Sequence, residues 1–182
     1  MRLSRDGRSI YDLTGRVSAL ALACLAGAAC GDATAPLPTE GPPRELTYST
    51  GGFAITLYNV RLAGDTVVFT STTSRSGPEP IVLVTRRVPR AEEWRTFWRT
   101  VRDAGVSRWP GECYDHGATD GGTLDFVLAW DGTRRTGHYY AAFPSRDGTC
   151  ANGDGASGAA ASFRQAVFGL ADVQFLDPQR TP

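Results

Sequence analysis

The sequence predicts an α+β domain in which two helices pack on one face of an antiparallel sheet of about four to six strands. Three observations indicate this class. Apolar and polar residues alternate along much of the first half, and the apolar spacing becomes helical near residues 91–105. A second alternating stretch is then centred on an Asp-Gly pair. Because strands joined by short turns pair antiparallel, we expect the sheet to be built from hairpins.

The first predicted hairpin lies in "ELTYSTGGFAITL", residues 45–57. Apolar residues alternate on both sides of the Gly-Gly pair at 51–52, and such a pair favours a tight hairpin turn. A turn centred there places Tyr48 opposite Ile55 and Leu46 opposite Leu57. Two further strands are predicted in "DTVVFTSTT" and, after the turn-rich "SRSGPEP", in "PIVLVTRRV".

The segment "PRAEEWRTFWRTVRDAGV" predicts the first helix. Its first turn is acidic, its last turn is basic, and Gly105 follows as a terminator. The residues at helical spacing are aromatic or aliphatic: Trp94, Phe97, Trp98 and Val101. We therefore expect this helix to bury one strongly apolar face.

A second hairpin is predicted in "TLDFVLAWDGTRRTGHYYA", where Asp131-Gly132 favours a type I′ turn. This register sets His138 directly across from Asp125, and the pair is interpreted as a structural cross-strand contact. One face of the hairpin should be apolar, with Leu124, Phe126, Leu128 and Trp130. The final segment "SGAAASFRQAVFGLADV" predicts a shorter helix with Phe163, Val167 and Leu170 on its buried side.

The N-terminal residues have the pattern of an export signal. Residues 1–16 carry four arginines, and "VSALALACLAGAA" at 17–29 is an uncharged run, shorter than the roughly 20 residues of a membrane span. Small residues then precede Cys30, so the segment resembles a bacterial lipoprotein signal peptide, although Gly27 stands where that family usually has an aliphatic residue. The resemblance implies cleavage before Cys30 and its acylation. Cys24 as the acylated residue, secretion without lipid and an uncleaved anchor are the alternatives.

These patterns divide the chain into a signal peptide at 1–29, a tether rich in Pro and Gly at 30–44, an α+β domain at 45–176 and a tail at 177–182. Two or more acyl chains on Cys30 would give lasting attachment. The expected location is the cell envelope, with the domain facing the periplasm or the exterior and the membrane as one partner.

Export changes the interpretation of Cys113 and Cys150, which are then the two cysteines of the mature domain. In an oxidising compartment such a pair favours a structural disulfide. This bond would close a loop of about 38 residues and contribute about 4 kcal/mol in the chain-entropy model. The alternative is two free thiols that lie too far apart to bond.

The segment "GECYDHGATDGG" holds the densest cluster of chemically active side chains, with Cys113, Asp115, His116 and Asp120. A zinc site usually needs four ligands, and His138 is the one other histidine of the sequence. A disulfide at Cys113 would also remove the thiolate that a nucleophile or a metal site requires. The glycine-rich "SRDGTCANGDGASG" lacks the acidic ends of a calcium loop. We therefore predict a polar loop, with no catalytic residue, metal or cofactor.

Binding surfaces are predicted only in outline. Four of 19 basic and two of 19 acidic residues precede residue 30, so the mature part is slightly acidic and has no general field for nucleic acid. Seven arginines between 86 and 108 could face anionic lipid or an acidic partner, or form the solvated side of the helix. Tyr58, Tyr139 and Tyr140 are the candidate ligand-facing residues, on the sheet face away from the helices.

The residues "STGGFAITLYNV" resemble the opening motif of emfourin-type proteins, small bacterial inhibitors of thermolysin-like metalloproteases. The subsequent order of an aromatic helix, an Asp-Gly hairpin and a closing helix is also similar. Ile55 replaces a glycine of that motif, and residues 65–88 add strands. The leading hypothesis is an exported, lipid-anchored, non-enzymatic domain that binds a protein or an envelope ligand. A metalloprotease inhibitor is the alternative, and an enzyme with an unrecognised site is the third.

Overall fold

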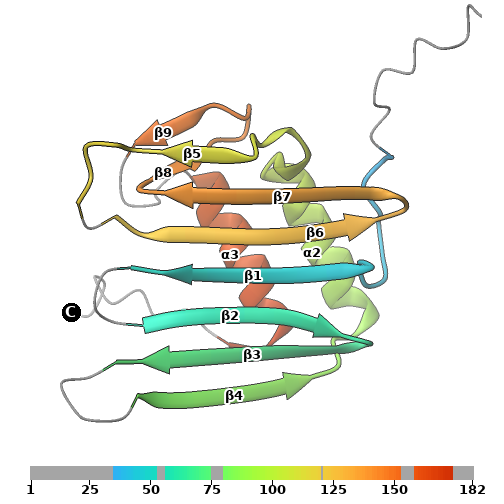
Figure 1. The fold of residues 1–182 in the computed structure, drawn as a ribbon. Helices are drawn as coiled ribbons and strands as arrows, with labels where there is room; N and C mark the ends of the chain where they lie inside the picture. The colour runs from blue at the N-terminus through green and yellow to red at the C-terminus, as the bar shows by residue number, and fades with distance from the viewer. Residues whose placement is uncertain (1–34, 53–55, 75–79, 120, 153–157, 174–182) are drawn as a thin grey trace, which may run out of the picture. The chain divides into compact units, whose positions relative to one another are not determined.

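A computed structural model of the protein describes residues 35–52, 56–74, 80–119, 121–152 and 158–173 (Figure 1). The chain divides into two units, 1–34 and 35–182, and only the second is described. The expected signal peptide, Cys30 and the tail at 177–182 therefore lie outside the described residues. The fold is α+β, as predicted, with a mostly antiparallel sheet and two helices.

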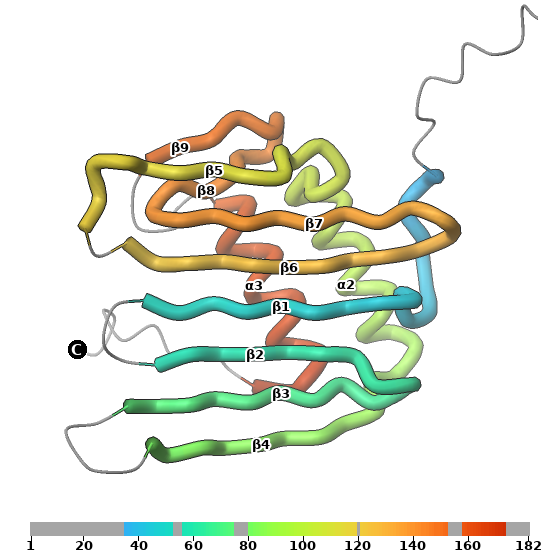
Figure 2. The backbone as a smooth tube through the Cα atoms, viewed as in Figure 1, coloured from blue at the N-terminus to red at the C-terminus, as the bar shows by residue number. Residues whose placement is uncertain are grey.

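The main sheet has seven strands in the order β4-β3-β2-β1-β6-β7-β5. Every neighbouring pair is antiparallel except β5, which runs parallel to β7. Both helices cross the same face of this sheet (Figures 1 and 2). The elements are β1 (Glu45–Gly51), β2 (Thr56–Ala63), β3 (Thr66–Thr73), β4 (Ile81–Arg87), α2 (Ala91–Asp103), a 3-10 turn (Val106–Arg108), β5 (Glu112–Tyr114), β6 (Thr123–Trp130), β7 (Thr133–Tyr140) and α3 (Gly158–Leu170).

The core fills the space between the helices and the sheet, and aromatic rings dominate it. Phe163 of α3 packs edge-on against Tyr48, Trp109 and Phe126, with ring centroids 5.8, 5.5 and 5.2 Å away. All of the predicted apolar residues of α2, α3 and β6 are buried. These two helices and the Asp-Gly hairpin are confirmed, and Asp131 and Gly132 have the positive φ values of 38° and 79° that the turn requires.

The predicted register of the first hairpin is wrong. β1 pairs with β2 so that Tyr48 lies opposite Val60 and Thr50 opposite Tyr58, rather than Tyr48 opposite Ile55. The shift is an odd number of residues, so it exchanges the two faces of the second strand. Leu57 is consequently 44% exposed, whereas Tyr58 packs against Phe168 of α3 with ring centroids 5.7 Å apart. Ile55 lies outside the described residues.

The predicted tether does not stand clear of the domain in its described part. Residues 35–44 form no helix or strand, as expected, but they form hydrogen bonds with side chains of α2 and of the β6–β7 hairpin. The indole of Trp98 donates to the Gly41 carbonyl at 2.8 Å, and the indole of Trp130 donates to the carbonyls of Ala35 and Pro36 at 3.2 Å. Buried indole N–H groups need such acceptors, which fixes this segment in place.

A small second sheet of β8 (Ala142–Pro144) and β9 (Cys150–Asn152) adjoins β5. The expected disulfide between Cys113 of β5 and Cys150 of β9 is present, with Cα atoms 5.8 Å apart. The bond therefore fastens the small sheet to one edge of the large one. None of the strands in this region was predicted, because three-residue strands carry no readable alternation.

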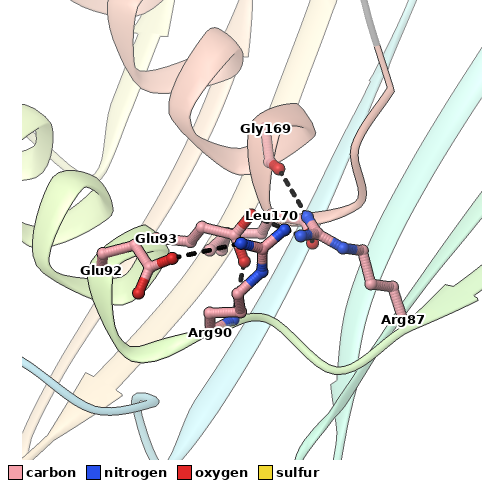
Figure 3. A network of polar contacts seen from close by, with 6 residues as sticks. All are labelled: Arg87, Arg90, Glu92, Glu93, Gly169 and Leu170. Carbon is pink, nitrogen blue, oxygen red and sulfur yellow. Dashed lines mark hydrogen bonds and ion pairs between the residues drawn. The ribbon is translucent and has the colours of Figure 1, made fainter.

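The opposite side of the helix layer is fastened by Arg87 at the end of β4. Its guanidinium pairs with Glu93 of α2 and donates to the carbonyls of Gly169 and Leu170, each at 3.4 Å (Figure 3). Helix C-terminal carbonyls have no intrahelical partner, so this arginine satisfies the end of α3. Glu93 also accepts a 2.6 Å hydrogen bond from the backbone amide of Arg90 at the start of α2.

Candidate functional site

The sheet face opposite the helices is the first candidate surface, because neither described helix covers it (Figure 1). The strand register aligns one row of polar side chains across four strands. Asn59 of β2 lies opposite Ser49 of β1, which lies opposite Asp125 of β6, which lies opposite His138 of β7. We call this set the polar row. Its side chains share the uncovered face because they alternate with the buried residues of the same strands.

A shallow hollow of about 420 Å³ lies beside the polar row. Most of its lining surface is apolar, and the charged and hydroxyl-bearing side chains of Arg61, Asp125, Thr47 and Thr136 contribute to it. Arg61 lies directly opposite Thr47 on the neighbouring strand and is exposed. Such a surface offers a cation and an anion a few strands apart, and it can recognise a ligand that carries both hydrogen-bond donors and acceptors.

Three aromatic rings, those of Tyr114, His116 and His138, lie close together at the β7 end of the polar row. His138 forms a hydrogen bond with Asp125 through Nδ1, and the ring centroid of Tyr114 lies 5.5 Å from that of His138. Tyr114 also stacks on His116, with the ring planes 15° apart. The predicted cross-strand pairing of His138 with Asp125 is confirmed. Tyr114 is 41% exposed and was not anticipated, because its strand, β5, is too short to predict.

The polar row contains the residue types of a hydrolytic triad but in an unsuitable order. A general base must lie within hydrogen-bond reach of the nucleophile that it activates. Asp125 stands between Ser49 and His138, so these two side chains are two strands apart, or roughly 10 Å at the ordinary strand spacing. The geometry therefore gives Ser49 an acidic neighbour instead of a basic one.

The three tyrosines predicted to face a ligand differ in burial and in the face of the sheet on which they lie. Tyr139 is fully buried on the helix side, where it packs against Trp109 and donates to the Pro110 carbonyl at 2.7 Å. Tyr58 also points toward the helices, as a consequence of the shifted register. The structure therefore contradicts the prediction for both. Burial raises the pKa of the Tyr139 hydroxyl well above its ordinary value, as expected for a core residue. Tyr140 alone lies on the uncovered face, half-buried.

The acidic loop does not assemble a metal site among the described residues, where no three His, Cys, Asp or Glu side chains converge. Asp115 instead accepts a 2.9 Å hydrogen bond from the amide of Gly117, which is an ordinary turn contact. Cys113 is committed to the disulfide, and Asp120 lies outside the described residues.

Strand β4 is the second candidate surface. Four consecutive apolar residues of this edge strand are exposed, namely Ile81 (48%), Val82 (52%), Leu83 (63%) and Val84 (46%). Isolated exposed apolar residues are common, whereas a contiguous set on a sheet edge marks an interaction site or an aggregation hazard. We call these four residues the β4 apolar edge.

Several of the arginines between 86 and 108 have structural partners. Besides Arg87, Arg102 donates to the Pro38 carbonyl at 3.3 Å and Arg108 donates to the Arg146 carbonyl at 2.8 Å. These contacts fasten the extended N-terminal segment and the turn before β9. The basic excess therefore serves the fold at these positions.

No protein-family model, curated protein or solved structure matches the chain. In the part that the structure describes, neither α2 nor α3 has the length and apolar character of a membrane span.

Proposed function

We propose that the protein is an exported, lipid-anchored, non-enzymatic domain that binds a protein or a cell-envelope ligand on the uncovered face of its sheet. The observation that carries the proposal is the polar row with its adjoining hollow. Antiparallel sheets often leave one face to solvent, and a face that combines Arg61, Asp125 and aromatic rings is suited to specific contacts.

The order of side chains in the polar row supports binding rather than catalysis. Ser49 and His138 are separated by Asp125, and the hollow is shallow and open to water. Catalytic sites depend on convergent groups that are held away from bulk solvent. Recognition does not need either feature, since rim charges and hydroxyl groups contribute specificity even at exposed surfaces.

The location is supported by the export signal and by the disulfide. Cys113 and Cys150 are at bonding distance, which suits an oxidising compartment. Intact-mass measurement of membrane-extracted protein, with and without reductant, tests this part. The expected chain begins at Cys30, carries the added mass of acyl chains and gains two mass units on reduction. A chain that begins at Met1 with reduced thiols would refute the proposed location.

Site-specific photo-crosslinking tests the binding face. A photoreactive residue at Thr47, beside Arg61, should form a discrete adduct in intact cells, and one at Arg99 on the exposed side of α2 should not. The adduct should disappear in the Arg61→Glu variant while its melting temperature stays unchanged. Equal adducts from Thr47 and Arg99, or an adduct that Arg61→Glu leaves intact, would refute the uncovered face as the site.

A metalloprotease inhibitor is the second candidate, favoured by the resemblance to emfourin-type proteins. The order implied by that resemblance matches the arrangement of α2, the β6–β7 hairpin and α3. Adding the purified protein to a thermolysin-type protease tests it directly. Undiminished cleavage of a fluorogenic peptide at micromolar concentrations of the protein would remove this candidate.

A further inference from the structure

The two edges of the main sheet differ in how far other parts of the protein cover them. At one edge β5 is three residues long, and the small β8–β9 sheet and the Cys113–Cys150 disulfide lie against it. At the other edge, β4 pairs with β3 along its whole length, Ile81 to Arg87, without a bulge. Short strands, bulges and covering elements are the usual protections of a sheet edge. Within the described residues, none of these protects Ile81–Val84, and the charged residues of β4, Arg86 and Arg87, lie at its carboxyl end.

The β4 apolar edge is exposed on both of its faces. On the helix side of the neighbouring strand, Val67 and Phe69 are almost fully buried, whereas Ile81 and Leu83 on the same side of β4 remain about half or more exposed. The helix layer therefore does not extend over these residues, although Arg87 at the carboxyl end of β4 contacts both helices. Val82 and Val84 project from the uncovered face, where they are exposed as well. A strand added beside β4 would find apolar contacts above and below the sheet.

The sequence of β4 is self-complementary for antiparallel pairing. A two-fold axis at Leu83, perpendicular to the sheet, places Leu83 opposite its own copy, Val82 opposite Val84 and Ile81 opposite Thr85. In this register each residue faces one that projects from the same side of the sheet, as antiparallel pairing demands. No charged residue meets a like charge.

The charges of β4 also favour this direction. Arg86 and Arg87 lie together at its carboxyl end. In antiparallel pairing the arginines of the two copies lie at opposite ends of the interface, roughly 20 Å apart for two Arg86 residues at the ordinary rise per residue. Parallel pairing would set them side by side, which like charges oppose.

We propose that β4 pairs antiparallel with β4 of a second copy of this chain, so that two seven-stranded sheets join into one continuous sheet. Main-chain hydrogen bonds and eight apolar side chains, four from each copy, form the contact. An isologous interface of this kind closes after two copies and therefore does not propagate into fibres. The proposal is independent of the ligand on the uncovered face, although pairing would set two such faces side by side.

Cysteine cross-linking tests the register. In the full chain purified in detergent and exposed to a mild oxidant, Leu83→Cys should form a covalent dimer through two sulfur atoms at the two-fold axis. Thr85→Cys is the matched control, since it is exposed on the same strand and the same face, but its two copies lie roughly 14 Å apart in this register. The wild-type chain reports any cross-linking by its own cysteines. A dimer with Leu83→Cys alone supports the pairing.

Sedimentation of the same preparations gives an independent measurement. Leu83→Lys should weaken dimerisation at least tenfold, because two ammonium groups would meet at the axis and an exposed position tolerates the change in the monomer. Leu57→Lys is the control, since Leu57 is also an exposed leucine of the sheet but lies two strands inside the edge. It should leave the dissociation constant unchanged.

Three outcomes would overturn the proposal. A wild-type chain that stays monomeric up to about 100 µM would exclude a second copy as the occupant. Equal cross-linking by Thr85→Cys and Leu83→Cys would show random collision. A Leu83→Cys adduct with a different protein that co-purifies with the chain would assign the edge to another partner. Loss of the photo-adduct on the uncovered face would not bear on any of these results.

Discussion

Reduction of the Cys113–Cys150 disulfide should lower the free energy of unfolding by about 4 kcal/mol. The bond links residues separated by 37 positions, and the chain-entropy model gives this value for a closed loop of that length. The structure adds a local expectation. β9 is exposed along all three residues and pairs only with β8 and not with the main sheet, so the bond is its covalent attachment to β5. The β8–β9 region should therefore loosen first.

Urea unfolding followed by tryptophan fluorescence measures this effect, because all four tryptophans are buried. With the denaturant dependence that is usual for small domains, about 1–3 kcal/mol per M, the midpoint should fall by roughly 1 to 4 M on adding reductant. Hydrogen exchange should show faster exchange in β8 and β9 under native conditions than in β6 or β7.

A Cys113→Ala/Cys150→Ala variant is the matched control. Alanine is chosen because Cys113 is buried, where a serine hydroxyl would add its own penalty. This variant should unfold near the midpoint of the reduced wild type, and reductant should not change it further. A difference below about 1 kcal/mol between the oxidised and reduced wild type would refute the reasoning, since the loop would then be constrained equally well without the bond.

Three further predictions concern the core and the helix layer. Gly137→Ala should destabilise the protein by about 1–3 kcal/mol in thermal melts, because a Cβ would lie 2.4 Å from Cε1 of Phe126, whereas Gly169→Ala in open helix surface should be neutral or stabilising. Glu93→Gln should cost about 1 kcal/mol at pH 7. The backbone amide of Arg90 at the start of α2, and then Arg87, hold the pKa of Glu93 below its ordinary value. The stability that Glu93 contributes is therefore present above its unfolded-state pKa and is lost as the pH falls through its folded-state pKa. The free energies of unfolding of the wild type and Glu93→Gln should accordingly converge in acid. Trp98→Phe should remove a hydrogen bond and part of a fully buried side chain, so it should cost more than the roughly 0.5–1.5 kcal/mol of the hydrogen bond alone. It should also accelerate proteolysis within residues 35–44, and unchanged cleavage there would contradict the packing of this segment.

The elements predicted correctly are those whose signals are local. In α2, the acidic first turn, the helical spacing and Gly105 all lie within one segment, and Gly105 has the positive φ of 73° that ends a helix. The β6–β7 register follows from Asp131-Gly132, because a two-residue turn leaves no freedom in the pairing. Both could be derived from fewer than twenty residues of sequence.

The register of β1 and β2 could not be derived in this way. Between residues 53 and 62, apolar residues occupy both alternating sets, since Leu57 continues one set and Tyr58 and Val60 belong to the other. Only the packing against α3 decides between them, by burying Tyr58 beside Phe168. This register also explains why Tyr58 is absent from the uncovered face, whereas Tyr139 lies on the helix side because it alternates with His138 and Tyr140 along β7.

Contacts between segments far apart in the chain also could not be predicted from the sequence. The parallel strand β5, the packing of residues 35–44 on Trp98 and Trp130, and the position of β1 between β2 and β6 join segments far apart in the chain. The polar row depends on this topology, because Asn59 and Ser49 meet Asp125 only when β1 pairs with β6. A single sequence carries no signal for such pairings.

The exposed edge follows from the dimensions of the two layers. Both helices run across the strands (Figure 1), and 13 residues make each of them roughly 20 Å long, so each covers about four to five strands. Six steps of about 4.8 Å separate the outer strands of a seven-stranded sheet, which is about 29 Å. The sheet must therefore extend beyond its helices. At β5 the small sheet occupies the excess, whereas at β4 the chain presents Ile-Val-Leu-Val, side chains that water alone does not favour at this position. A charged residue among these four would have protected this part of the edge without any partner, whereas the charged residues of β4 lie at its carboxyl end, Arg86 and Arg87, which agrees with the proposed pairing.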